Sequence, residues 1–344
     1  MDKPDSSIPK DKTPALYSEA LQVKAERYLV QQQDMKDEYG LLLPKNWDGT
    51  PREHGDALMW NSIALASMCL IDDTENDFGI MSLFEAYQQL QAEDGRLFRH
   101  PTIRESNTRT TISKDQITGF LYLAKTAKDT ECIISGGIGS MLQRFAEYAR
   151  LHKWQIGVGK TDITTTYWTD RHLLKKVLQL YGLDTSGLDL KTSIHDTKGM
   201  SYIADDIFYT HYKCRKDGGG YCEIAKGTSV FPAHLAFLSA MIMGEVSSLK
   251  ELAKVGDNIG FNNWLFVTGY RTTQKRKTFN DVEKFLVEDF PDDLPNEING
   301  VKGWGCTDYI WQRAPLEKCD NDTRTNIGND LIHVYALIQF YKRS

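Results

Sequence analysis

Apolar residues recur along the chain at the three- and four-residue spacing of one helix face, and runs that alternate apolar with polar positions are scarce. The first stripe lies within about 20 residues and consists of Leu16, Ala20, Leu21, Ala25, Tyr28 and Leu29. Further helices are predicted over residues 56–71, 78–92, 115–129, 136–152, 169–181, 200–212, 232–245, 247–256, 278–289 and 329–342. With few credible strands, the pattern predicts an all-α protein.

The connections between these segments alternate in length. Some are compact, such as residues 72–77, whereas long ones rich in Gly, Pro, Trp, Arg and Asp precede every second helix. The helices after the long connections begin near residues 56, 115, 170 and 234, at intervals of about 60 residues, which indicates a weak repeat of helical hairpins. Such hairpins either stack as a solenoid or close into a ring with the long loops at one end.

Two of the long connections carry recognisable sequence. The first contains Trp47-Asp48-Gly49, and the second contains the run Glu-Asp-Gly-Arg-Leu-Phe-Arg-His-Pro at 93–101 and leads into Ser-Lys-Asp-Gln-Ile-Thr-Gly at 113–119. Together with the alternating connections, this texture resembles the (α/α) toroids of glycoside hydrolases and polysaccharide lyases, including the unsaturated glucuronyl hydrolases. The resemblance covers residues 14–342 and is one of architecture. It implies five or six hairpins around one core and a carbohydrate-active function.

Length alone, 344 residues, favours about two domains, since domains average ~150 residues. No shift in composition divides the chain, however, and the hairpin period runs across its middle. We therefore expect one toroid domain over residues 14–344, preceded by a polar, disordered segment at 1–13.

Charge and hydropathy exclude two classes of partner. The net charge of −6 supplies no field that attracts nucleic acid. The most apolar stretch, residues 57–71, contains Asn61, Ser62 and Ser67 and is too short to span a membrane. The expected partner is an oligo- or polysaccharide substrate, and the oligomeric state is left open.

The cysteines leave the cellular compartment open. Cys214 and Cys222 bracket a glycine-rich tip, and Cys306 and Cys319 bracket a second loop, so two local disulfides or reduced thiols are both consistent with the spacing. The chain begins without a charged-then-apolar signal segment, so it stays in the cytosol, leaves by another route, or had a signal removed. Paired cysteines would favour a periplasmic or secreted protein.

Acidic residues in the long connections are the candidate catalytic groups. Hydrolysis of a glycosidic bond normally uses two carboxyl groups, one as acid and one as base or nucleophile. We expect Asp56 and Asp115 to form this pair, with Asp94 and Asp308 as further candidates. Asp56 and Asp115 also fall at predicted helix starts, where an aspartate caps backbone N–H groups, and Asp94 belongs to an Asp-Gly-Arg sequence typical of a turn.

Aromatic and basic residues in the same connections would line the sugar subsites, because apolar sugar faces stack on aromatic rings and Arg binds carboxylates with two hydrogen bonds. The predicted substrate-binding residues are Trp47, His54, Arg99, His100, Trp168, Asp170, Tyr309, Trp311 and Arg313. No metal or cofactor site is predicted, since Gly157–Thr161 lacks the first glycine of a phosphate-binding loop. Two alternatives stay open: a lyase that uses Tyr or His with Arg, and a non-enzymatic scaffold that binds a glycan or a protein.

Overall fold

The computed structural model describes residues 14–45, 56–71, 77–103, 112–154, 168–188, 231–254, 262–274, 278–294, 309, 311 and 327–344. Within these ranges the regular secondary structure is helical, apart from two isolated β-bridges. The expected all-α class is therefore confirmed for this part of the chain. None of its helices is both long and apolar enough to cross a bilayer.

The α-helices are α1 (Pro14–Gln31), α2 (Ala57–Ile71), α3 (Asp77–Gln88), α4 (Lys114–Asp129), α5 (Ser135–Leu151), α6 (Trp168–Leu180), α8 (Phe231–Met243), α9 (Val246–Ala253), α11 (Trp264–Thr273), α12 (Asn280–Glu288) and α13 (Asn329–Arg343). Two short 3₁₀ helices, η1 (Gln32–Met35) and η3 (Pro101–Ile103), follow α1 and precede α4. Each predicted helix that falls in the described ranges is present, with ends within about one turn of the prediction. The segment predicted at 200–212 lies outside the described residues.

Helix α11 was not predicted from the sequence. Its middle contains Val267, Thr268 and Gly269, residue types of low helix propensity. Tertiary contacts hold it instead: Asn263 caps its start by accepting a hydrogen bond from the backbone N–H of Phe266, 3.2 Å away. A Cβ atom at Gly269 would lie 2.3 Å from the Phe237 ring, so only glycine permits the close packing of α11 on α8.

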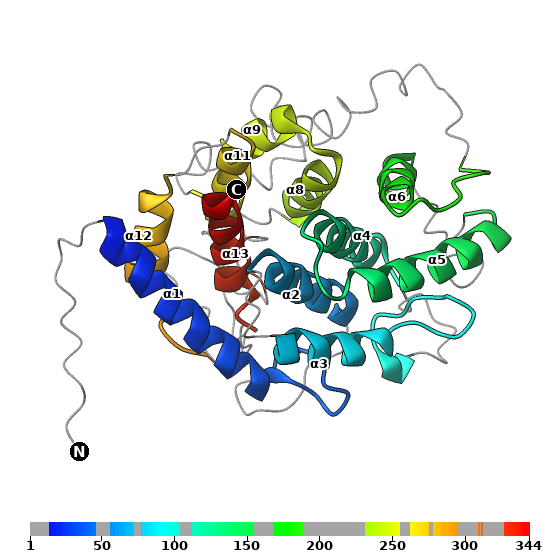
Figure 1. The fold of residues 1–344 in the computed structure, drawn as a ribbon, viewed down its shortest axis with the longest axis horizontal. Coiled ribbons are helices and arrows are strands. Elements are labelled where there is room, and N and C mark those ends of the chain that lie inside the picture. The colour runs from blue at the N-terminus through cyan, green and yellow to red at the C-terminus, as the bar shows by residue number, and fades with distance from the viewer. Residues whose placement is uncertain are drawn as a thin grey trace, which may run out of the picture.

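Two layers of helices are visible in Figure 1, in which α1, α3 and α5 lie outside α13, α2 and α4. Helix α2 packs against both α4 and α13, and α4 also contacts α8. Contacts then continue from α8 to α9, from α9 to α11, and from α11 to α13. One connected hydrophobic core extends from α1 to α13.

Helix α2 is buried almost all round because its sequence is apolar almost all round. Its polar residues satisfy their hydrogen bonds locally. Asn61 bonds both the backbone N–H and the carbonyl of Leu42, at 2.9 and 3.0 Å, while the Ser62 and Ser67 hydroxyls donate to carbonyls one turn earlier. These polar groups therefore fit an interior helix.

The connections that lead from α1 to α2 and from α3 to α4 begin with the same kind of turn. An isolated bridge closes each turn, Lys36 with Leu42 and Gln91 with Leu97. Gly95 has φ of 93°, as the turn interpretation of Asp-Gly-Arg predicts, and a Cβ there would lie 2.1 Å from a backbone oxygen of α5. The shared turn supports the repeat inferred from the sequence.

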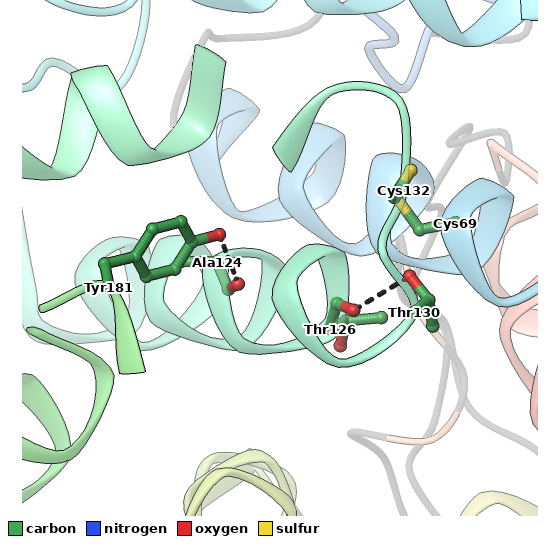
Figure 2. The surroundings of a disulfide bond; sticks show 6 residues. All are labelled: Cys69, Ala124, Thr126, Thr130, Cys132 and Tyr181. Atoms are coloured by element: carbon green, nitrogen blue, oxygen red, sulfur yellow. Dashed lines mark hydrogen bonds between the residues drawn. A yellow bond between two sulfur atoms is a disulfide. The ribbon is translucent and has the colours of Figure 1, made fainter. Parts of the chain in front are cut away.

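A disulfide joins α2 to the turn after α4 (Figure 2). Cys69, two residues before the end of α2, is bonded to Cys132, with the two Cα atoms 5.3 Å apart and a sequence separation of 63. The turn itself is held by Thr130, whose hydroxyl donates to the Thr126 carbonyl at 2.9 Å. The sequence analysis did not predict this pairing, and its two suggested pairs lie outside the described residues.

Candidate functional site

The N-terminal ends of α2 and α4 meet and bring the two predicted catalytic aspartates together. Asp56 immediately precedes α2, and its backbone carbonyl accepts the first helical hydrogen bond, from the Trp60 N–H at 3.0 Å. Asp115 is the second residue of α4. Both carboxylates thus lie where the positive end of a helix dipole favours negative charge.

Gln116 links the two carboxylates. Its side-chain nitrogen Nε2 lies 2.8 Å from Asp56 Oδ1 and 3.4 Å from Asp115 Oδ2. The two carboxylate oxygens can therefore be no farther apart than the sum of these two distances. Ser113 also donates its hydroxyl to Asp115 Oδ1.

Arg99 completes this group from the connection after α3. Its guanidinium Nη1 donates to Asp56 Oδ1 at 3.1 Å, and its backbone carbonyl accepts from the Leu58 N–H at 3.2 Å. The Asp56 side chain is 36% exposed and that of Arg99 is 19% exposed, so solvent reaches the ion pair. We call Asp56, Arg99, Asp115 and Gln116 the carboxylate cluster.

The carboxylate cluster contains groups that acid–base chemistry uses: two carboxyl groups close enough to act on the same bond of a ligand, an amide donor and a guanidinium. It does not have the composition of a metal site. Within the described ranges, no three His, Cys, Asp or Glu side chains are grouped so that they could hold a metal ion.

Two further predicted residues, His100 and Asp94, lie close to the turns. His100 is fully buried, with Nε2 2.7 Å from Asp37 Oδ2, Nδ1 2.8 Å from Thr102 Oγ1, and its ring edge-on to Tyr39. It presents no surface to solvent in the described structure, and its contact with substrate stays a prediction. Asp94 accepts a hydrogen bond from the backbone N–H of Arg96 within its own turn, at 3.0 Å.

The side chains of Tyr309 and Trp311, which are predicted to line subsites, are both fully buried, and that role stays a prediction. The Trp311 indole N–H donates to the Asp330 carbonyl at 2.8 Å, and its ring stacks near Phe290. The Trp311 carbonyl accepts from Asn263, which also caps α11. Trp311 is therefore hydrogen-bonded both to the residue that caps α11 and to α13.

A second group of polar side chains surrounds His333 in the core. Tyr122 and Tyr309 bring their hydroxyls to 2.9 Å from Nε2 and 2.8 Å from Nδ1 of His333, and the His234 ring lies 4.9 Å from that of Tyr309. Burial lowers the pKa of His333 to about 3 and holds that of His234 well below its usual range, with the neighbouring His333 adding to the effect. Both histidines are therefore neutral at pH 7. We call these four residues the buried tyrosine–histidine cluster.

The sequence analysis named only Tyr309 of the buried tyrosine–histidine cluster. The available signal was weak: Tyr122, His234 and His333 are polar positions inside strongly apolar helical segments. Gln116, which links the carboxylates, was also overlooked, although it stands in the quoted Ser-Lys-Asp-Gln sequence.

The remaining predicted residues lie outside the described part of the chain. These are Trp47, His54, Asp308 and Arg313, together with the side chains of Trp168 and Asp170 in the first turn of α6. Their roles stay predictions.

Comparisons of the chain with models of protein families, with curated proteins and with solved structures gave no match.

Proposed function

We propose that this protein is a carbohydrate-active enzyme, a glycoside hydrolase that uses Asp56 and Asp115 as its two carboxyl groups. The observation that carries the proposal is the hydrogen bonding of one amide group, that of Gln116, to both carboxylates. In glycosidases the paired carboxyl groups lie about 5–9.5 Å apart, on either side of the glycosidic bond. The two Gln116 distances set an upper limit on the separation of the Asp56 and Asp115 carboxylate oxygens, and this limit is consistent with the short end of the range.

The contacts of the two aspartates favour different roles. Asp56 Oδ1 accepts hydrogen bonds from both the Arg99 guanidinium and the Gln116 amide, and such donors stabilise a charged carboxylate. Asp56 is therefore assigned the role of base or nucleophile. Asp115 takes a hydrogen bond from the neutral Ser113 hydroxyl and a long one from Gln116, and it is assigned the role of general acid.

The proposal includes an (α/α) toroid as the fold. Its support is the order of helix contacts, which runs from α2 through α4, α8, α9, α11 and α13 and returns to α2. In a toroid of this kind, the long connections gather at one mouth. Residues 89–113 are one such connection, and they supply Arg99 to the carboxylate cluster.

An acidic glycan is the favoured substrate. Arg99 is partly exposed beside Asp56, and a guanidinium binds carboxylates with matched geometry. An acidic sugar placed against the two aspartates would need such a cation to offset the repulsion between like charges.

A screen of polysaccharides and cell-wall fragments tests the proposal. Release of reducing ends without a rise in absorbance at 235 nm is the expected result for a hydrolase. Reducing ends accompanied by the 235-nm absorbance of an unsaturated product would instead identify a lyase and overturn the two-carboxylate mechanism. Binding of a glycan without either signal would identify a non-enzymatic scaffold.

A further inference from the structure

Gln116 makes three side-chain hydrogen bonds although it is fully buried in the first turn of α4. Its Oε1 accepts from the Met59 backbone N–H at 3.0 Å, and its Nε2 donates to Asp56 and Asp115. We propose that Gln116 is a positioning residue that fixes the relative placement of the two carboxylates. The consequence for catalysis rests on the proposed function, whereas the placement itself does not.

The orientation of the Gln116 amide is determined by its partners. The Met59 N–H can only donate, so the atom that faces it must be the amide oxygen. The two carboxylates accept hydrogen bonds, so the atom that faces them must be the NH₂ group. Both requirements select the same orientation, and the flipped amide would lose all three hydrogen bonds.

This orientation gives Gln116 one N–H donor for each carboxylate. The two N–H bonds of an amide lie in one plane at a fixed angle, so they hold two acceptors in fixed directions. The amide itself is held by α2 through Met59 and by α4 through its own backbone. Sites on helices are more rigid than sites on loops, and small misplacements of catalytic groups cost large factors in rate.

Gln116 also satisfies a backbone N–H in the first turn of α2, one of the donors that a helix leaves without an internal partner. A residue that only capped α2 would make the same bond to Met59. Two substitutions separate these roles. Gln116→Glu keeps an oxygen for Met59 and replaces the two N–H donors by an acceptor, whereas Gln116→Met removes both the acceptor and the donors at similar length.

The kinetic test compares both variants with the wild-type protein on a glycan that the wild type cleaves. We expect kcat to fall roughly 10–100-fold in both variants while KM changes less than about threefold, as for other residues that orient catalytic groups. The control is Gln143→Glu, since Gln143 is exposed on α5 and donates a hydrogen bond to Glu147 one turn along. An unchanged kcat in Gln116→Glu would overturn the proposal, because that variant keeps the acceptor for Met59 and replaces both donors by a carboxylate oxygen.

A spectroscopic test needs no substrate. In the full-length protein labelled with ¹³C at the aspartate side-chain carboxyl carbon, Gln116→Met should shift the Asp56 and Asp115 resonances and leave that of Asp129, at the far end of α4, unchanged. Unshifted Asp56 and Asp115 resonances would overturn the positioning role. Shifted resonances in a protein that cleaves no glycan would support the positioning role and reject the proposed function.

Discussion

Two groups of polar side chains contact α4, and they differ in their access to solvent. The carboxylate cluster lies at the first turn of α4, with Asp56 36% exposed, and two of its members are acidic. The buried tyrosine–histidine cluster lies about two turns further along, around Tyr122, where Tyr309, His234 and His333 have no exposed surface.

This difference in solvent access distinguishes polar groups that stabilise the core from polar groups that are able to act on a ligand. Buried polar groups must bond to each other, because burial without a partner costs about 1–3 kcal/mol per group. His333 meets this requirement with two tyrosine hydroxyls. Charged groups at the surface keep their reactivity, so we assign structure to the buried tyrosine–histidine cluster and chemistry to the carboxylate cluster.

The largest effect on stability is expected from the centre of the buried tyrosine–histidine cluster. His333→Ala would leave a cavity and remove the bonds to Tyr122 and Tyr309, at a cost of about 3–5 kcal/mol in the free energy of unfolding. Urea denaturation measures this loss. The control is His152→Ala, whose ring is bonded to the Tyr148 carbonyl one turn back, and a loss for His333→Ala no larger than the control's would contradict the assignment.

Loss of the disulfide should destabilise the packing of α2 on α4. The disulfide lies at the ends of these helices that are remote from the carboxylate cluster. Cys69→Ala with Cys132→Ala removes a link that closes a long loop, which typically contributes about 2–4 kcal/mol. Thermal unfolding with and without a reductant measures it: the reductant should lower Tm more in the wild type than in the double variant. Equal shifts in both proteins would show that the link is absent.

Acid should destabilise the protein through the buried histidines. The pKa of His333 is lowered from 6.5 to about 3 in the folded protein, so between these values the unfolded chain binds the proton and the folded chain does not. Stability is therefore lost as pH falls below about 6.5, by up to ~1.4 kcal/mol per pH unit for His333, and His234 contributes in the same direction. Denaturation between pH 7 and 4 measures how steeply the free energy of unfolding changes with pH. The variant His333→Phe should show a weaker dependence on pH.

The smallest effect on stability is expected at the carboxylate cluster. Asp56→Asn weakens a partly exposed ion pair with Arg99 and keeps a residue that caps helices well, so unfolding should change by less than about 1 kcal/mol. A loss above ~3 kcal/mol in urea denaturation would show that Asp56 is a structural residue, contrary to the assignment.

The sequence predicted most helices from their periodicity, and it predicted Asp56 and Asp115 as a pair because the alternating connections resemble a toroid in which the long loops lie at one end. It did not predict α11, whose Val, Thr and Gly residues disfavour an isolated helix and which depends on Asn263 and on packing against Phe237. Tertiary contacts of this kind have no local signature.

The burial of Tyr309 and Trp311 and the Cys69–Cys132 pair could not be predicted for the same reason. Aromatic residues in a long loop have the same composition whether they face a ligand or bond to the core, as Trp311 does through Asp330. Cysteines 63 residues apart are brought together only by the packing of α2 on α4, and the sequence favoured pairs that were close in the chain.

The most direct test of the account compares the rates of Asp56→Asn and Asp115→Asn with that of the wild type, on the first glycan the wild type hydrolyses. The control is Asp129→Asn, at the other end of the helix that carries Asp115. The account predicts that each site variant loses 10²–10⁴-fold in kcat, as for removal of a general acid or base, while the control keeps its rate. Full activity in both site variants would contradict it.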